Sequence, residues 1–255
     1  MNRILLAVGL LFVSCTLARG ADSLPPTLSP GSPAPDFDLP GVDGRNYSLK
    51  DFAEAEVLVV VFTCNHCPTA QYYEERIKRL VVDYRDRGLA LVAISPNDPK
   101  SVRLDELGYT DLSDTFEEMK VRAKHREFNF PYLYDGETES VSKKYGPVVT
   151  PHAFVFDAER KLQYVGRIDN AERIQYVTSH DLRDAIDAVL AGKTPAVQET
   201  KVVGCSVKWA GKEDGVRGYM EKLAAEPVAV DYADAAALEA LRKNESGKLR
   251  LVNFW

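Results

Sequence analysis

Short, almost continuous runs of apolar residues mark the middle of the chain. Residues 56–62 and 89–94 are rich in β-branched and aromatic side chains, which is typical of strands that are buried on both faces. Residues 153–156 and 162–165 are shorter apolar runs that a charged turn separates, and they predict a hairpin. A smaller hairpin is expected over residues 37–49, where two glycines flank the turn.

Amphipathic stretches separate these strands. Apolar residues recur at roughly helical spacing over residues 71–87, and Ser113-Asp114 and Ser179 are expected to cap the second and the last helix. The predicted helices cover residues 71–87, 113–127, 138–145 and 179–190. The order of strand, helix, strand, helix, strand, strand and helix predicts an α/β fold, with a central mixed β-sheet flanked by helices, over residues 31–191.

The rest of the chain has a different pattern. Residues 192–215, which include Cys205, are predicted to form a linker. Residues 216–255 carry two predicted helices, at 216–224 and 234–243, followed by an apolar, strand-like run that stops in mid-pattern. An apolar strand end that stays exposed is an aggregation hazard. We therefore expect residues 216–255 to be the incomplete N-terminal part of a second domain.

The first twenty residues have the pattern of a signal peptide. Asn2-Arg3 forms a positive start, and the apolar run over residues 4–13 is too short to span a bilayer. Ala18-Arg19-Gly20 places small residues ahead of a cleavage site before Ala21. We expect export to the periplasm or the extracellular space, where disulfides persist, with no membrane-spanning segment after cleavage.

Cleavage before Cys15, with a lipid attached to that cysteine, is the alternative, and Phe12 fits it less well. Residues 21–30 are rich in proline and are expected to be extended. The chain has 32 Lys and Arg against 38 Asp and Glu, a formal net charge of −6, and no basic run, so we expect no nucleic-acid partner. It also lacks a glycine-rich dinucleotide motif, so no organic cofactor is expected.

The candidate chemistry lies in Cys64-Asn65-His66-Cys67-Pro68, between the first central strand and the first long helix. Two cysteines at this spacing can bridge, and a helix N-terminus favours a thiolate. We expect Cys64 to lie at that terminus as a nucleophile of low pKa, as disulfide exchange requires. An inert disulfide and half of a zinc site are the alternatives, although no second Cys/His pair has ligand spacing.

Three landmarks resemble the thioredoxin-fold redoxins. The Cys64–Pro68 motif after a buried strand looks like their redox motif. Gly31-Ser32-Pro33-Ala34-Pro35-Asp36-Phe37-Asp38-Leu39, with Leu49-Lys50-Asp51-Phe52, resembles the opening of the alkyl hydroperoxide reductase/thiol-specific antioxidant (AhpC/TSA) branch. Thr150-Pro151, ahead of the strand at 153–156, is similar to the cis-proline loop of these proteins. The resemblance covers about residues 28–191.

The resemblance implies a thioredoxin-like fold, thiol–disulfide oxidoreductase activity and a redox-active disulfide. Cys64 would be the nucleophile and Cys67 the resolving thiol. Pro151 would be cis, and the backbone of Thr150 would contact a peptide substrate beside the disulfide. His66 would tune the Cys64 thiolate by donating a hydrogen bond to it or by placing positive charge nearby. The alternative for His66 is a solvent-facing residue of the helix.

The other histidines and the C-terminal run complete these expectations. His152 is expected to be packed, although it could face the same site, and His125 and His180 are expected at the surface. Residues 251–255 look like the strand that, in thioredoxin-like thiol reductases, leads into Trp-x-x-Cys-x-x-Cys. The second domain is therefore expected to be thioredoxin-like as well.

Two departures from the family patterns keep other functions open. Thr63 replaces the usual thioredoxin Trp before the first cysteine, and no Thr lies three residues before Cys64 or Cys67, where peroxiredoxins carry one. Cys67-Pro68-Thr69 still resembles the peroxiredoxin Cys-Pro-Thr, so a thiol peroxidase is the first alternative. A copper-binding chaperone that uses Cys64, Cys67 and a histidine is the second, because soft thiolates suit Cu(I).

The sequence thus predicts an exported thiol–disulfide oxidoreductase. Its expected partners are a protein disulfide or dithiol, or a small peroxide, and an upstream thiol donor or acceptor. Cys205 remains after Cys64 and Cys67 are paired, and it is a candidate third redox thiol, an intermolecular partner or a small buried residue.

Overall fold

The computed structural model describes residues 24–107, 110, 112–228, 232–243 and 245–249. The chain divides into two compact units, residues 1–216 and 217–255. The predicted signal peptide and the run at 251–255 lie outside the described residues. Helix α5 (Glu213–Ala225) begins at the end of the first unit, and helix α6 (Ala235–Lys243) belongs to the second. The second thioredoxin-like domain therefore stays a prediction.

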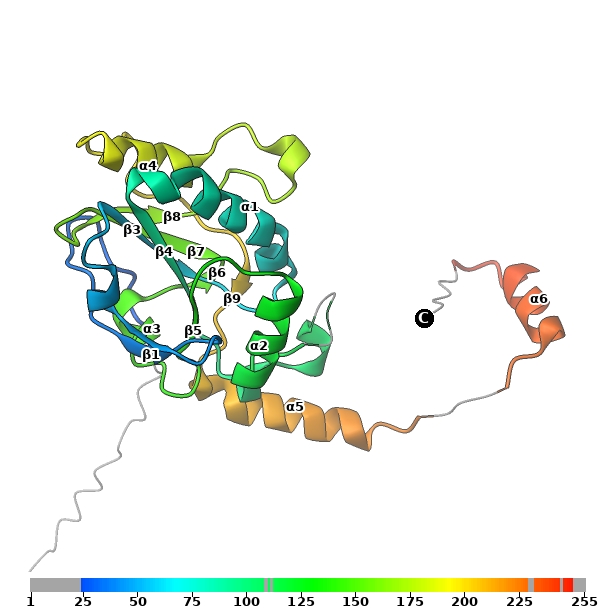
Figure 1. The fold of residues 1–255 in the computed structure, drawn as a ribbon. Helices are drawn as coiled ribbons and strands as arrows, with labels where there is room; N and C mark the ends of the chain where they lie inside the picture. Colours follow the sequence, from blue (N-terminus) through cyan, green and yellow to red (C-terminus); the bar gives the residue numbers. More distant parts are fainter. Residues whose placement is uncertain (1–23, 108–109, 111, 229–231, 244, 250–255) are drawn as a thin grey trace, which may run out of the picture. The chain divides into compact units, whose positions relative to one another are not determined.

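A mixed five-stranded sheet forms the centre of the first unit (Figure 1). Its strands, in spatial order, are β5 (Tyr132–Tyr134), β4 (Leu89–Ser95), β3 (Val57–Phe62), β7 (His152–Phe156) and β8 (Leu162–Gly166). β3 pairs in parallel with β4, and β4 in parallel with β5, whereas β7 is antiparallel to both β3 and β8. Every residue of β3 and β7 is buried, as their continuous apolar runs predict.

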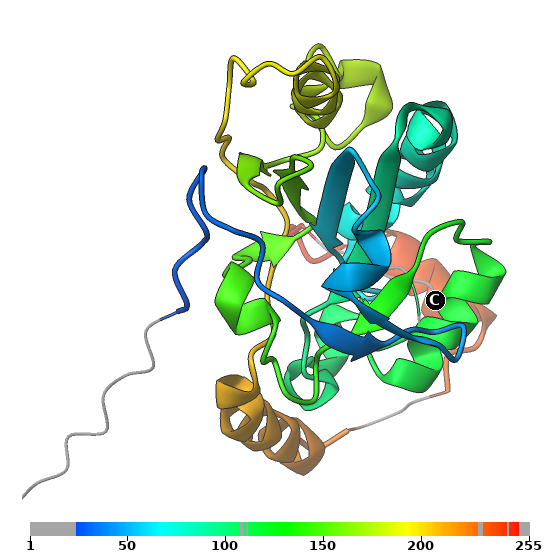
Figure 2. The same cartoon turned by 60° about the vertical axis from the view of Figure 1, so that its left-hand side comes forward.

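Helices and a small hairpin cover opposite faces of this sheet. The first face meets α1 (Pro68–Tyr84), α2 (Phe116–His125) and α4 (Asp181–Leu190). The second face meets the hairpin of β1 (Asp38–Pro40) and β2 (Asn46–Ser48), together with α3 (Ser142–Tyr145). Figures 1 and 2 show α1 and α4 together on one side. Single 3-10 turns lie at Leu49–Phe52, Arg85–Arg87, Pro99–Ser101, Leu104–Glu106, Ile174–Tyr176 and Ala210–Lys212.

The predicted fold class is correct, but several boundaries differ. α1 begins at Pro68, three residues earlier than expected, because proline suits the first helical position. The side chain of Thr115, not of Ser113 or Asp114, caps α2. α3 has only four residues, and His180, not Ser179, precedes α4. Strand β5 was not predicted, because three residues between Pro131 and Asp135 are too few to show a pattern.

The linker predicted at 192–215 is wrong for residues 198–209, which are part of the fold. β9 (Cys205–Ser206) pairs antiparallel with β6 (Val149–Thr150), so that Cys205 lies opposite Thr150. The backbone N–H of Asp98 donates to the carbonyl oxygen of Lys208 at 2.9 Å, and Trp209 is buried. These backbone pairings fix the segment on the first unit.

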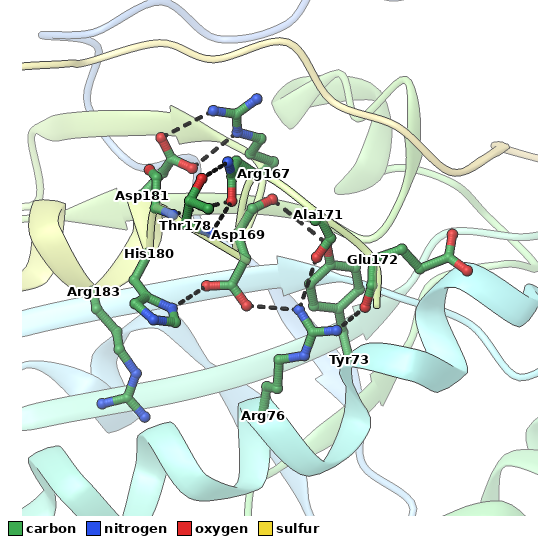
Figure 3. Close-up of polar contacts among 12 residues, drawn as sticks. Tyr73, Arg76, Arg167, Asp169, Ala171, Glu172, Thr178, His180, Asp181 and Arg183 are labelled. Atoms are coloured by element: carbon green, nitrogen blue, oxygen red, sulfur yellow. Dashed lines mark hydrogen bonds and ion pairs between the residues drawn. The ribbon is translucent and has the colours of Figure 1, made fainter. Parts of the chain in front are cut away.

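Polar contacts fasten the loop after β8 to helix α1 (Figure 3). The Arg76 guanidinium lies 2.7 Å from the Asp169 carboxylate and also donates to the carbonyl oxygens of Ala171 and Glu172. The same carboxylate meets Nδ1 of His180 at 2.7 Å. Because the Thr69 hydroxyl in the first turn of α1 donates to Glu172 at 3.1 Å, this loop also borders the redox motif.

Candidate active site

The strand-to-helix turn from β3 to α1 positions the two cysteines of the motif. Cys67 is the N-cap of α1, and its Sγ accepts a 3.4 Å hydrogen bond from the backbone N–H of Ala70. Our prediction placed Cys64 at the helix terminus, and this placement is wrong, because Pro68 starts the helix directly after Cys67. The unpaired N–H groups of the first turn therefore face Cys67.

Both thiols are enclosed and meet the loop of Thr150 and Pro151. The Cys64 Sγ lies 3.1 Å from the Thr150 hydroxyl, and the Cys67 thiol donates to the Thr150 carbonyl oxygen at 3.2 Å. Cys64 is 3% exposed and Cys67 is fully buried. Cys205 is half-buried and packs against the pair, and its thiol is in hydrogen-bonding contact with Cys67. The structure therefore brings three thiols together.

The surroundings shift the pKa values of these thiols in opposite directions. Hydrogen bonds from the Cys205 thiol, the Cys64 thiol and the Ala70 N–H lower the pKa of Cys67. Burial raises the pKa of Cys64, and the contact with Cys67 and the charge of Asp114 raise it further. The hydrogen bond to Cys67 and burial also raise the pKa of Cys205. The surroundings therefore favour a thiolate on Cys67 over one on Cys64 or Cys205.

The Thr150–Pro151 peptide bond is cis, which is the geometry that the resemblance implied. The backbone of Thr150 was expected to meet a peptide substrate, but it pairs instead with Cys205 of β9. The approach is close: a Cβ added to Gly204 would lie 2.1 Å from the Thr150 carbonyl oxygen. Only glycine fits this position without a shift of the backbone.

His66 is fully buried, which excludes the solvent-facing alternative. Its Nδ1 lies 2.6 Å from the carboxylate of Asp114, and its Nε2 has no hydrogen-bond partner in the described part of the chain. The Asp114 carboxylate also accepts hydrogen bonds from the backbone N–H groups of Asn65 and His66 and from the side chain of Asn97, at 2.7–3.2 Å. These hydrogen bonds fix the backbone between Cys64 and Cys67.

Sequence reasoning missed Asp114, which it interpreted as a helix cap. The residue is 48 positions from His66 in sequence, so no spacing signal connects them. It also missed Asn97, whose side-chain oxygen accepts from the backbone N–H of Lys208 at 2.9 Å and so ties the Cys205 segment to the same network. Buried polar residues of this kind are recognised only once the fold brings their partners together.

The remaining histidines lie where the sequence indicated. His152 is buried, its ring centroid lies 4.7 Å from that of Phe154, and its Nδ1 accepts from the backbone N–H of Val148. Burial lowers the pKa of His152 to about 4. His125 and His180 are exposed. Neither of these two belongs to the cysteine site.

One set of side chains has its ligand atoms close enough together to bind a metal ion. Ligand atoms of Cys64, His66 and Asp114, all buried, lie within 4.8 Å of one another. The Asp114 oxygens already accept hydrogen bonds from four groups, so sulfur and imidazole are the ligands that the set can still offer. Cys67 and Cys205 would add soft thiolates, which Cu(I) prefers.

Comparisons with known proteins agree with this geometry. The sequence model of the AhpC/TSA family matches residues 30–165, which include the Cys64–Cys67 motif and Pro151. A hypothetical protein from Sinorhizobium meliloti has a crystal structure that is similar to this chain, with 36% identity and a TM-score of 0.64. That similarity covers 72% of this chain and 97% of the other.

Two curated relatives carry names from different redox classes. Thiol-disulfide oxidoreductase ResA of Bacillus thuringiensis is 23% identical over 201 residues, which are 76% of this chain and 98% of that protein. A Mycobacterium tuberculosis protein named as a peroxiredoxin is 33% identical over 75 residues, 29% of this chain and 48% of that protein. No helix in the described part of the chain combines the length and the apolar character needed to cross a bilayer.

Since the family model covers more than half of the chain, the chain belongs to the AhpC/TSA family, shares its thioredoxin-like fold and is an oxidoreductase.

Proposed function

We propose that the protein is an exported thiol–disulfide oxidoreductase that exchanges the dithiol and disulfide forms of Cys64 and Cys67 with protein substrates. The observation that carries this proposal is the contact of the two thiols at the N-terminus of α1, with the pKa of one lowered and that of the other raised. A thiolate is the attacking species in disulfide exchange, and a low-pKa thiol is also a good leaving group.

The chemistry balances as a two-electron exchange. In a direct exchange, a Cys67 thiolate attacks one sulfur of a substrate disulfide and releases the other as a thiolate, which takes up a proton. Cys64 then loses its proton and attacks the Cys67 sulfur of the mixed disulfide, so that a Cys64–Cys67 bond forms and the second substrate thiol leaves. The substrate disulfide is reduced to two thiols, and the reverse sequence oxidises a dithiol. These roles reverse the assignment of nucleophile and resolving thiol that the sequence suggested.

Asp114 and His66 are positioning residues in this proposal. The carboxylate of Asp114 contacts both backbone N–H groups of the Asn65-His66 turn, and so it fixes the loop between the two cysteines. Its charge disfavours a thiolate on Cys64. These contacts favour the proton on Cys64 and the charge on Cys67.

A thiol peroxidase is the second candidate. The lowered pKa of Cys67, which stands in Cys67-Pro68-Thr69, favours it. The absence of a Thr three residues before either cysteine of the motif argues against it, because Val61 and Cys64 occupy these positions. Peroxidase activity predicts rapid consumption of hydrogen peroxide by the reduced protein and a sulfenic acid on Cys67.

The N-terminal pattern alone supports export. We propose that cleavage before Ala21 releases the protein to the periplasm or the extracellular space, where an upstream thiol donor or acceptor resets the cysteines. Fractionation and N-terminal sequencing of the protein from its native cell check this location. A lipid on Cys15 would overturn the cleavage before Ala21, and an intact N-terminus in the cytoplasm would overturn export.

The reduction potential of the Cys64/Cys67 pair is the direct test. The full chain with Cys15→Ser is equilibrated in graded glutathione and dithiothreitol buffers, thiols are alkylated, and their number is counted by mass. We expect one reversible two-thiol transition, with a midpoint between about −120 and −270 mV, the range of thioredoxin-fold oxidoreductases. The transition should vanish in Cys67→Ser, and peptide mapping of the oxidised parent should assign the disulfide to Cys64 and Cys67.

The result also separates the alternatives. A midpoint near −120 to −180 mV would make the protein an oxidant or isomerase, and one near −270 mV would make it a reductant. Without a reversible transition the oxidoreductase proposal fails. One-to-one retention of Cu(I) that depends on Cys64 would then favour the copper-binding chaperone.

A further inference from the structure

A third thiol lies against the pair at a fixed place. Cys205 is opposite Thr150 in the β6–β9 pairing, and its thiol is in hydrogen-bonding contact with Cys67. Cys67 is also in hydrogen-bonding contact with Cys64. Cys67 therefore lies between two thiols, either of which can become its disulfide partner.

The segment that carries Cys205 is held on both sides of that residue. Before it, Gly204 lets the strand approach the Thr150 carbonyl, where a Cβ would be only 2.1 Å away. After it, the backbone N–H of Lys208 donates to Asn97, and the Lys208 ammonium lies 2.6 Å from Glu106. The position of Cys205 thus results from backbone fit and buried polar contacts.

Exposure differs among the three sulfurs in a way that bears on exchange. Cys64 is 3% exposed and Cys67 is not exposed, so an external thiol has little access to a disulfide between them. Cys205 is half-buried and is the most exposed of the three. Disulfide exchange depends on access to the sulfur that is attacked.

We propose that Cys205 is the exchange thiol of this protein, through which a disulfide formed by Cys67 passes between the buried pair and an external protein. Cys67 would bond alternately to Cys64 and to Cys205. This inference rests on the proposed oxidoreductase function of the pair, and it names the route by which a partner reaches that pair.

The route balances without an added oxidant. Starting from the Cys64–Cys67 disulfide, the Cys205 thiolate attacks the Cys67 sulfur, a Cys67–Cys205 bond forms, and Cys64 leaves and takes up the proton that Cys205 lost. An external thiolate then attacks the Cys205 sulfur and releases Cys67 as a thiolate. A second thiol of the external protein attacks the mixed disulfide and releases Cys205. The external dithiol is oxidised, and Cys64 and Cys67 are reduced.

The electrostatics of the cluster favour one step of this route, the departure of Cys67, whereas the raised pKa of Cys205 disfavours its thiolate. Cys67 has a lowered pKa, because thiol and backbone N–H donors stabilise its thiolate. A thiol of lower pKa leaves more readily in disulfide exchange. The central sulfur, which must leave in the exchange with the external thiol, is therefore the best leaving group of the three.

The first experiment maps the disulfide. In a Cys15→Ser, Cys64→Ser chain oxidised with diamide, we expect a Cys67–Cys205 bond. After trypsin this bond would join the peptide of residues 51–76 to that of residues 202–208. A Cys15→Ser chain that retains both Cys64 and Cys67 should also yield a fraction of these linked peptides when it is partly oxidised. If neither chain yields them, the proposal is overturned.

The second experiment measures the rate of exchange. Oxidised Cys15→Ser protein is mixed with reduced glutathione, samples are alkylated at intervals, and thiols are counted by mass. Cys205→Ser should slow reduction of the Cys64–Cys67 disulfide by about tenfold or more, because direct attack on a buried disulfide remains as the only route. Ser206→Ala, at the exposed neighbouring position of β9, is the matched control and should react at the unmutated rate.

The two experiments separate this inference from the proposed function. If Cys205→Ser keeps the two-thiol transition and also keeps or raises the rate, β9 only covers the pair and the inference falls while the function stands. If no protein, with or without Cys205, shows a reversible transition of Cys64 and Cys67, the proposed function itself has failed.

Discussion

Two buried aspartates each meet a histidine, but the two sites compensate the aspartate charge differently. His66 meets Asp114 at 2.6 Å beside the cysteines, and His180 meets Asp169 at 2.7 Å in the loop after β8. Both carboxylates are buried. A buried carboxylate must be compensated by hydrogen bonds or by an opposite charge, and the two sites solve this in different ways.

The Asp169 site is a charge-compensated clamp. Arg76 of α1 adds a guanidinium at 2.7 Å, and the side chain of His180 is half exposed (Figure 3). The Asp114 site is enclosed: His66 is fully buried, and no Lys or Arg side chain bonds to Asp114 within the described residues. Because no cationic side chain from Lys or Arg compensates it, the charge of the Asp114 carboxylate acts on the neighbouring Cys64 thiol and raises the pKa of that thiol.

Exchanging each aspartate for asparagine is the strongest way to break this comparison. Asp114→Asn places an amide among four N–H donors, and we expect it to lower the free energy of unfolding by about 3 to 4 kcal/mol. Asp169→Asn should lower the free energy of unfolding by about 1 kcal/mol, because Arg76 still donates hydrogen bonds to the carbonyl oxygens of Ala171 and Glu172. Urea unfolding of both variants measures the difference, and equal losses would contradict the distinction.

A histidine without a carboxylate sharpens the comparison. Burial lowers the pKa of His152 from 6.5 to about 4. Above pH 6.5 the ring is neutral whether the chain is folded or unfolded. As the pH falls from 6.5 toward 4, the unfolded chain binds a proton that the folded chain does not, so stability is lost, by about 3 kcal/mol near pH 4.

Unfolding free energies at pH 7 and pH 4 test this value. His152→Gln keeps an acceptor for the Val148 N–H and removes the titration, so its stability should depend less on pH over this range. The same pH dependence in the variant and the parent would refute the assignment to His152.

The fit of β9 gives the next effect in size. Gly204→Ala would drive a Cβ into the Thr150 carbonyl, and we expect a loss of about 2 kcal/mol with a lower yield of the Cys67–Cys205 disulfide. Gly215→Ala is the control, because a Cβ there meets no atom within 4 Å. If both alanine variants were equally stable, the close approach would not matter to the enclosed site.

The smallest effect belongs to the exposed pair. His180→Ala should cost about 0.5 kcal/mol, since its side chain is half exposed and Asp169 retains Arg76. His66→Ala should cost several times more, because it leaves a fully buried carboxylate without one of its donors. Thermal or urea unfolding of the two variants compares them directly.

Local pattern predicted most of the fold. The runs that became β3, β4, β7 and β8 are long and apolar enough to be recognised, whereas β5 owes its existence to pairing with β4 over three residues. The segment around Cys205 was interpreted as a linker, because its polar, proline-containing lead does not show the pairing with Thr150. Long-range pairing of so few residues leaves almost no trace in a sequence.

The site was predictable in the same uneven way. The sequence showed two of the site's motifs, the Cys64/Cys67 pair and Thr150-Pro151, and these lie close to one another in the fold. Which of two cysteines three residues apart lies at the helix N-terminus depends on where the helix begins, and the prediction chose Cys64, whereas Cys67 is the N-cap. Asp114 has an ordinary role in the local sequence and acquires its electrostatic role only from tertiary contact with His66.

The pairing of β9 with β6 also brings the third thiol to the site from a distant part of the chain. Cys205 follows Cys67 by more than a hundred residues, so strands β3 and β7 and helix α1 are all synthesised before the covering strand. Until residues 205–206 pair with residues 149–150, Cys67 has one thiol neighbour, Cys64, instead of two.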